Sequence, residues 1–200
     1  NITVSDLKNQ SGVVYSENQA VNIKASKTID NTEGLIQAKT NLNLDSQSLN
    51  NTTGLVAADQ IDQKHVTVNN NQGSIAAQQN LNSIVQQFDN TKGKIQAKSI
   101  ELKHNKIKNT GSVYAGQGLI ISGEMIQNAG SLAAGENVQI TSSSLVHAKG
   151  GLIAAGLDRE GRLNDTGALT INVDQAGLHG QTFAGNTIQV DAIGKIDAAQ

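Results

Sequence analysis

Apolar and polar residues alternate along short segments of this chain, and one such segment returns about every twenty residues. Each copy contains a glycine, followed two positions later by a branched apolar residue and four positions later by a small residue, usually alanine. Alternation with a period of two predicts a β-strand with one buried face. The glycines, spaced by 18 to 22 residues, are Gly12, Gly34, Gly54, Gly73, Gly93, Gly111, Gly130 and Gly150.

Two further strand segments are predicted in each copy. About eight residues past the glycine, two apolar residues recur two positions apart, as in Leu42 and Leu44. The copy then ends in an apolar residue, any residue and Asn, as at residues 49–51. The copies after Gly54 and Gly73 depart from this pattern. A fixed period of this length is typical of solenoids, so the sequence predicts an all-β protein, a parallel β-helix with about 20 residues per coil.

Asparagine residues precede the glycines at the predicted turns. Glycine and asparagine accept positive φ angles at low cost, which suits both to turns. Asparagines at one position of successive coils can also stack as a ladder of amides. We therefore expect a structural role for these residues. They are Asn9, Asn31, Asn51, Asn70 and Asn90, three positions before their glycine, and Asn109 and Asn128, two positions before.

Composition narrows the function classes. The chain of 200 residues has no Pro and no Cys, 2% aromatic residues and a net charge of −2. Missing proline suits a chain in which nearly every residue donates to a β-ladder. A near-neutral charge argues against nucleic-acid binding, which needs clustered Lys and Arg. No signal-peptide pattern and no apolar run of membrane-spanning length is present, so we expect no membrane span.

The repeat is interrupted once, after Gly150. Removing about ten residues restores the period, so residues 157–166 are predicted to be a loop inserted into a single β-helix segment of residues 1–200, whose coils resume over 180–200. Because the repeat runs to both termini, we interpret the chain as an internal slice of a longer protein. Loops on rigid scaffolds often carry binding. The candidate binding residues are Asp158, Arg159, Glu160, Arg162, Asn164 and Asp165.

Other candidate chemistry is weaker. The loop has oxygen donors suited to Ca²⁺, but not the spacing of an EF-hand. His65 and His104 share a repeat position two coils apart, about 10 Å at the spacing of paired strands, which is too far to share a zinc ion. Asp30 and Asp89 are about 14 Å apart on the same reasoning, too far for a glycosidase pair. We expect no catalytic residues, no metal, no cofactor and no enzymatic activity.

One coil is basic, with six lysines between residues 92 and 108 and only Glu101 opposing them. It could attract a sulfated glycan or an anionic cell surface. A solvated face of a rod is the alternative interpretation of the same residues.

The repeat unit Asn-x-x-Gly-x-[Ile/Val/Leu]-x-Ala, as at residues 31–38 and 90–97, resembles the haemagglutinin repeat of filamentous-haemagglutinin-type exoproteins. The resemblance covers residues 1–154 and fragments of 180–200. It implies a right-handed β-helical rod of a secreted bacterial surface protein, exported through an outer-membrane two-partner secretion transporter.

Members of that family are adhesins or contact-dependent growth inhibition effectors, and the resemblance implies a shaft that projects binding or toxin modules from the cell. The absence of cysteine suits such export, since a disulfide would block threading. As alternatives, the segment itself binds a cell-surface receptor or glycan through residues 157–166 or the basic coil, or it is a β-helical polysaccharide-active enzyme.

Overall fold

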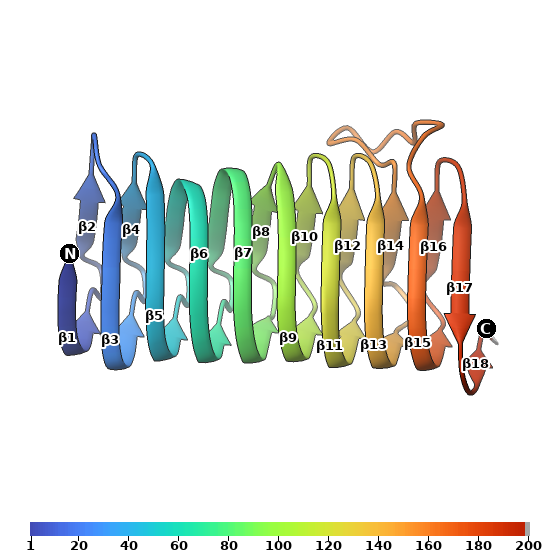
Figure 1. The fold of residues 1–200 in the computed structure, drawn as a ribbon, viewed down its shortest axis with the longest axis horizontal. Helices are drawn as coiled ribbons and strands as arrows, with labels where there is room; N and C mark the ends of the chain where they lie inside the picture. Colours follow the sequence, from blue (N-terminus) through green and yellow to red (C-terminus); the bar gives the residue numbers. More distant parts are fainter. Residues whose placement is uncertain (199–200) are drawn as a thin grey trace.

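A computed structural model describes residues 1–198 as a stack of β-coils (Figure 1). None of these residues belongs to a helix of the length and hydrophobicity that crossing a membrane requires. The strands are β1 (Ile2–Lys8), β2 (Val13–Ser16), β3 (Val21–Asp30), β4 (Leu35–Ala38), β5 (Asn41–Asn50), β6 (Leu55–Asn69), β7 (Ser74–Asn90), β8 (Lys94–Ala97), β9 (Ser99–Asn109), β10 (Ser112–Ala115), β11 (Leu119–Asn128), β12 (Ser131–Ala134), β13 (Val138–His147), β14 (Leu152–Ala155), β15 (Leu169–Leu178), β16 (Gln181–Ala184), β17 (Ile188–Ala192) and β18 (Ile196–Asp197).

Each coil typically contains one short and one long strand. The coil of β8 and β9 shows this division, with 4 and 11 residues. In β6 and β7 the two merge into continuous strands of 15 and 17 residues. Equivalent strands of successive coils pair in parallel, and the sheet winds through about ten turns with coils about 19 residues apart. The predicted parallel β-helix is confirmed.

The long strand turns a corner near its middle. Pairing between neighbouring coils skips one residue there, at Gln47, Val66, Gln86 and Asn105. In Figure 1 the long strands run down the front of the molecule and curve to the back at the lower edge. Each coil therefore contributes three β-segments, which correspond to the three apolar segments of the repeat.

The core is a set of columns, each built from one repeat position. Ile36, Val56, Ile75 and Ile95 lie in register on successive coils, and all are fully buried. Burying one such side chain contributes roughly 1.5–3 kcal/mol. Because each side chain packs against the coils before and after it, this burial is shared along the stack and no single coil has a core of its own.

A ladder of buried asparagine side chains runs beside this core. The Nδ2 of Asn9 donates to the Oδ1 of Asn31 at 2.7 Å, and the same bond joins each later Asn of the series to the next, at 2.7–2.8 Å. In the next coil His147 occupies the ladder position, with its Nδ1 3.3 Å from Asn128 Nδ2. These turn asparagines therefore bond the coils together along the axis.

The glycines of the repeat serve close packing, which corrects their assignment to positive φ. Positive φ angles of 51–55° occur instead at the residue before each of the first five glycines, Ser11, Glu33, Thr53, Gln72 and Lys92. A Cβ on Gly54 would overlap the main-chain oxygen of Asn31 and approach Asn51 Oδ1 to 2.6 Å. Glycine is needed here because no side-chain atom fits between the asparagine ladder and the previous coil.

The assignment of Gly150 to the repeat position is wrong by one residue. Ser131 pairs with Leu152, so Gly151 is the equivalent of Gly130, and Ile153 rather than Leu152 enters the core. Gly150 has a φ of 85° in a turn that is one residue longer than the turns of the first five glycines. It directly precedes Gly151, and in those turns the residue directly before the glycine is a non-glycine residue of positive φ. Two adjacent glycines made the two alignments indistinguishable in the sequence.

The irregular copies after Gly54 and Gly73 pair in parallel with their neighbours, with a register shift between Ala58 and Gln60. Their inward positions hold Gln63, His65 and Ser83, all buried, whereas Val66 and Ile84 point to solvent. The sequence looked irregular because polar residues occupy core positions. The coils continue at β16, where Gln181 pairs with Leu152, and residues 199–200 of the predicted final coils lie outside the described part.

Candidate functional site

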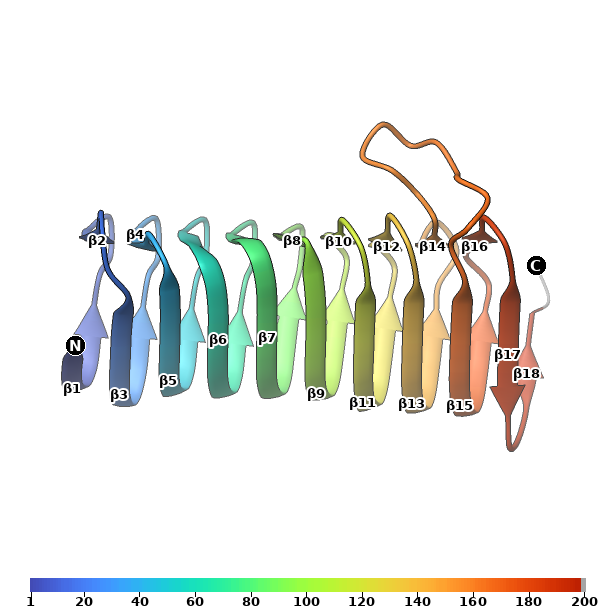
Figure 2. The same ribbon diagram turned by 45° about the horizontal axis from the view of Figure 1, so that its top comes forward.

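The chain leaves the coil between β14 and β15, at residues 156–168, which include the predicted loop 157–166. Figure 2 shows this segment projecting from the rod and leaning over the coils that precede it. It is an ordered hairpin: Leu157 and Leu163 form an antiparallel bridge, and the main-chain N–H of Asp158 donates to the Arg162 oxygen at 2.9 Å.

The charged side chains of the loop bond largely to one another. Asp158 accepts the main-chain N–H of Arg162 at 2.8 Å and its Nε at 2.9 Å, and Arg162 also lies 3.4 Å from Glu160. The main-chain N–H of Arg162 is the first cause that lowers the pKa of Asp158, with the guanidinium adding to it. Three of the six predicted binding residues therefore maintain the shape of the loop.

The other three predicted residues have different environments. Asn164 anchors the loop, since its Nδ2 donates to the Gly135 oxygen at 2.6 Å and its Oδ1 accepts the N–H of Gly167 at 3.0 Å. The Arg159 guanidinium lies 5.7 Å from the ring centroid of Tyr114 on β10, a cation–π contact across two coils. Asp165 is exposed. Only Arg159 and Asp165 present charges that other loop residues do not pair.

The basic coil does not form one patch. Lys94 is on β8, Lys92 and Lys98 lie in turns, and the remaining lysines are spread along β9 and its corner. Lys103 pairs with Glu101 at 2.8 Å, and Lys108 pairs with Asp89 at 3.2 Å. The six charges surround the rod, so an anionic ligand would meet only part of them at once.

Asp30 and Asp89 lie on the same column, three coils apart, as expected from the sequence. Each accepts the main-chain N–H of the threonine two residues later, at 3.1 Å for Asp30 and 2.9 Å for Asp89. These bonds are Asx-type turns that stabilise the corner before the asparagine ladder. Their carboxylates therefore have a structural explanation.

His65 and His104 lie in register two coils apart, inside the solenoid. His65 Nδ1 bonds Ser46 Oγ at 2.8 Å, and His104 Nε2 bonds Ser83 Oγ at 2.9 Å. Desolvation lowers the pKa of His65 to about 4 and that of His104 to about 3. Both imidazoles are therefore neutral at pH 7.

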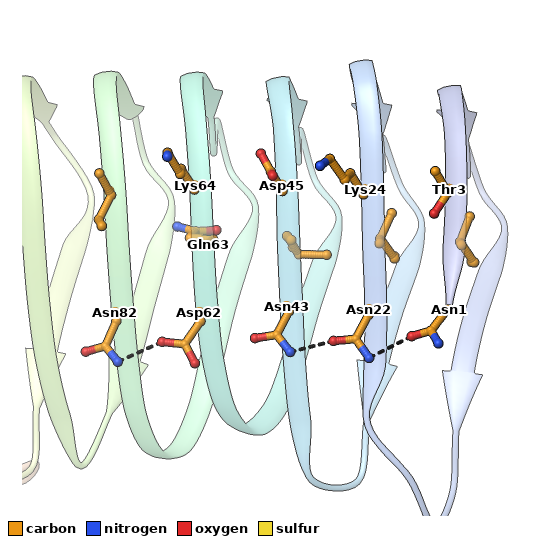
Figure 3. A pocket seen from close by; sticks show the side chains of 14 residues that line it. Asn1, Thr3, Asn22, Lys24, Asn43, Asp45, Asp62, Gln63, Lys64 and Asn82 are labelled. Atoms are coloured by element: carbon orange, nitrogen blue, oxygen red, sulfur yellow. Dashed lines mark hydrogen bonds between the residues drawn. The ribbon is translucent and has the colours of Figure 1, made fainter.

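A groove that was not predicted from the sequence crosses β1, β3, β5, β6 and β7 on the front face (Figure 3). It encloses about 360 Å³. We call its two walls the amide row and the charged row, and its floor is the main chain between them. The amide row is Asn1, Asn22, Asn43, Asp62 and Asn82. The charged row is Thr3, Lys24, Asp45, Lys64 and Ile84.

The residues of each row share one outward repeat position, so they recur once per coil. This signal was present in the sequence as an Asn or Asp directly after the first inward apolar residue of the second segment, as in Leu42-Asn43 and Ile61-Asp62. The inward positions, which predict the core, carry no information on these outward rows.

Comparisons with family models, with curated proteins and with solved structures gave no match to this chain.

Proposed function

We propose that this β-solenoid is a structural shaft that holds other modules of a surface protein apart. The observation that carries this proposal is the unbroken asparagine ladder, which joins seven asparagines from Asn9 to Asn128 by bonds of 2.7–2.8 Å. A sheet of about ten coils at a strand spacing of about 4.8 Å extends roughly 45–50 Å. Bonds and core columns that both run along the axis resist bending and stretching.

The resemblance of the repeat to haemagglutinin repeats leads us to place this shaft in a secreted bacterial adhesin or contact-dependent growth inhibition protein at the cell surface. The specified residues of that repeat unit correspond here to the asparagine ladder, the close-packed glycine and the inward apolar column. Two-partner export through an outer-membrane transporter is part of this proposal. The lack of cysteine supports it, because no disulfide obstructs passage of the chain.

A second candidate function is recognition of a cell-surface receptor or glycan by the loop. The observation that favours it is the ordered projection of residues 156–168 from the rod, which presents Arg159 and Asp165 to solvent. The pairing of Arg162 with Asp158 and Glu160 favours the shaft function over recognition, since those charges are already compensated within the loop.

The test of the shaft measures its length and stiffness. Gln37 and Phe183 lie on one outward column, seven coils apart along the pairings, or about 34 Å at the strand spacing. The chain has no native cysteine, so Gln37→Cys with Phe183→Cys places two spin labels cleanly. We expect one narrow distance distribution, shortened by about one coil when residues 55–73 are deleted. A broad distribution would refute a rigid shaft.

Binding of the labelled chain to bacterial and mammalian cells separates the two functions. Residues 157–166 are kept in one sample and replaced by a short turn in the other. A shaft predicts no saturable binding by either sample while circular dichroism shows both folded. Saturable binding that disappears with the loop would make the loop a recognition site.

A further inference from the structure

The amide row of the groove is a hydrogen-bonded chain with a defined direction. Asn22 Nδ2 donates to Asn1 Oδ1 at 2.9 Å, and Asn43 Nδ2 donates to Asn22 Oδ1 at 2.6 Å. One coil beyond Asp62, Asn82 Nδ2 donates to Asp62 Oδ1 at 2.8 Å. Each bond holds one side chain in a single orientation, which lowers the entropic cost of binding a ligand.

The chain of bonds is interrupted between Asn43 and Asp62. Because Asn43 directs its nitrogen to Asn22, its oxygen faces the coil of Asp62, and Asp62 is a carboxylate with no proton to donate (Figure 3). Among the residues that the structure describes, none donates a hydrogen bond to Asn43 Oδ1 or to Asp62 Oδ2. Two exposed acceptors without a donor therefore lie on adjacent coils of the amide row, and hydroxyl groups from outside the chain can donate to them.

The charged row supplies complementary groups two residues further along each strand. Lys24, Asp45 and Lys64 follow one another on adjacent coils, and no ion pair within 4.0 Å joins them among the residues the structure describes. The two ammonium groups donate and the carboxylate accepts, and their charges together with Asp62 cancel. The amide nitrogens of Asn22, Asn43 and Asn82 each keep one N–H, since an amide has two and uses one in the row.

These groups repeat at the coil spacing of about 4.8 Å along the rod axis. A ligand that engages several coils must be a linear polymer with a similar repeat, rich in hydroxyl groups that both donate and accept, and without net charge. An extended β-1,4-linked glycan meets these requirements, because one sugar residue advances by nearly the distance of one coil. Alternate residues of such a chain are inverted, which suits the alternation of Lys and Asp.

We propose that this groove binds a neutral, extended β-1,4-linked glycan parallel to the rod axis, with sugar hydroxyl groups donating to Asn43 Oδ1 and Asp62 Oδ2. The site differs in place and chemistry from the loop and the basic coil. It goes beyond the shaft proposal, and the rod can hold modules apart whether or not the groove is occupied.

The decisive variant is Asp62→Asn. An asparagine here can donate to Asn43 Oδ1 and still accept from Asn82, so it would close the amide row and remove the acceptor pair. We expect unchanged or higher thermal stability together with a roughly tenfold weaker affinity, the effect of losing a hydrogen bond to a charged group. Glu136→Gln, an exposed carboxylate in a turn outside the groove, is the matched control and should leave affinity unchanged.

The probes are cello-oligosaccharides and chito-oligosaccharides of two to six residues, titrated into the intact 200-residue chain and followed by amide chemical shifts. Affinity should rise with oligosaccharide length, and shifts should appear on β3, β5, β6 and β7. The two series distinguish glucose-type from N-acetylglucosamine-type chains. Maltohexaose has an equal number of sugar residues but a curved α-linked backbone, and it should bind at least about tenfold more weakly.

Three results would each overturn the proposal: no binding of either β-linked series, equal binding of maltohexaose, or an affinity that Asp62→Asn leaves unchanged. A folded Asp62→Asn protein is established by its melting temperature and by the retained distance between labels at Gln37 and Phe183, so a loss of binding cannot be assigned to unfolding. That distance measurement also tests the shaft independently, because it is made without glycan.

Discussion

Two groups of buried polar side chains occupy the interior of this solenoid, and they are satisfied to different degrees. In the asparagine ladder each amide donates to the next coil, and the partners recur with the repeat. In the cluster that comprises Ser46, Gln63, His65, Ser83 and His104, three buried atoms lack a partner within the described chain: Gln63 Oε1, His65 Nε2 and His104 Nδ1.

The difference follows from periodicity. An amide that repeats on every coil always finds a donor or an acceptor at the strand spacing, whereas a cluster assembled from unlike residues satisfies only some of its groups. Ser46 Oγ donates to the Ser48 oxygen at 2.9 Å, so the bond to His65 requires a proton on Nδ1 and leaves Nε2 an acceptor. We expect the asparagine ladder to stabilise the fold and the incompletely bonded cluster to lower its stability.

The largest expected effect is acid destabilisation through the cluster. The lowered pKa values mean that the unfolded state binds more protons than the folded state below pH 6.5. The contribution of the two neutral histidines to the free energy of unfolding is therefore fully present above that pH. It is lost as the pH drops toward about 4 for His65 and about 3 for His104. The slope is about 1.4 kcal/mol per pH unit for each histidine. Asp45 raises the pKa of His65 and offsets part of the effect, while His65 further lowers that of His104.

Urea unfolding between pH 7 and pH 4.5 measures this slope. The double variant His65→Leu with His104→Leu should flatten it, since Ser46 keeps Ser48 as its acceptor, Ser83 keeps Gln63 as its donor, and Leu can still contact Phe88, on which His104 stacks at 4.7 Å. Equal slopes in parent and variant would show that other groups cause the acid response.

The next effect is removal of one ladder member. Asn70→Leu keeps the approximate shape but leaves Asn90 Oδ1 without its donor and removes the Oδ1 that accepts from Asn51. We expect a loss of roughly 2–5 kcal/mol in the free energy of unfolding, measured by urea denaturation, because two buried groups lose a partner. Asn82→Leu in the exposed amide row is the control, with a much smaller loss. Similar losses for the two variants would contradict a special contribution from the buried ladder.

Close packing against the ladder can be tested with Gly54→Ala. The added Cβ overlaps the Asn31 oxygen, so neighbouring coils must separate locally, at a cost of roughly 1–3 kcal/mol. The matched control is Gly118→Ala, where an added Cβ meets nothing within 4 Å. Thermal melting of both variants checks the prediction, which fails if both melt alike.

A smaller effect is expected from Gln63→Leu. This change removes an unpartnered buried oxygen and one bond of 2.7 Å to Ser83, which keeps its bond to His104. We expect a change within about 1 kcal/mol of zero, in either direction, by urea denaturation. A loss as large as that of Asn70→Leu would mean that the cluster stabilises the fold as much as the ladder does.

The smallest effect on global stability is expected in the loop. Arg162→Gln removes the side-chain contacts to Asp158 and Glu160, and Arg162 is 75% exposed. We expect the melting temperature to stay the same, because exposed ion pairs contribute little. Hydrogen exchange should become faster only over residues 156–168. Faster exchange in β14 or β15 would show that the loop braces the rod.

Much of this fold followed from the sequence by itself. The period defines which residues share a column, and alternation within a segment defines which of them face inward. The buried columns and the asparagine ladder could therefore be predicted from the sequence. Register follows as well, because a slip of one residue would turn the whole apolar set outward. The ambiguity between Gly150 and Gly151 shows the limit, since two glycines leave no side chain with which to choose.

Only the tertiary structure decided how residues of different columns and coils meet. Three features depend on side-chain direction as well as on register. They are the contact of the loop with Tyr114, the shared burial of His65 and His104, and the unbonded oxygens of Asn43 and Asp62 on adjacent coils. A repeat determines its own neighbours because each coil copies the last. Where one coil departs from the pattern, the partner of each polar group is set by the three-dimensional packing around it.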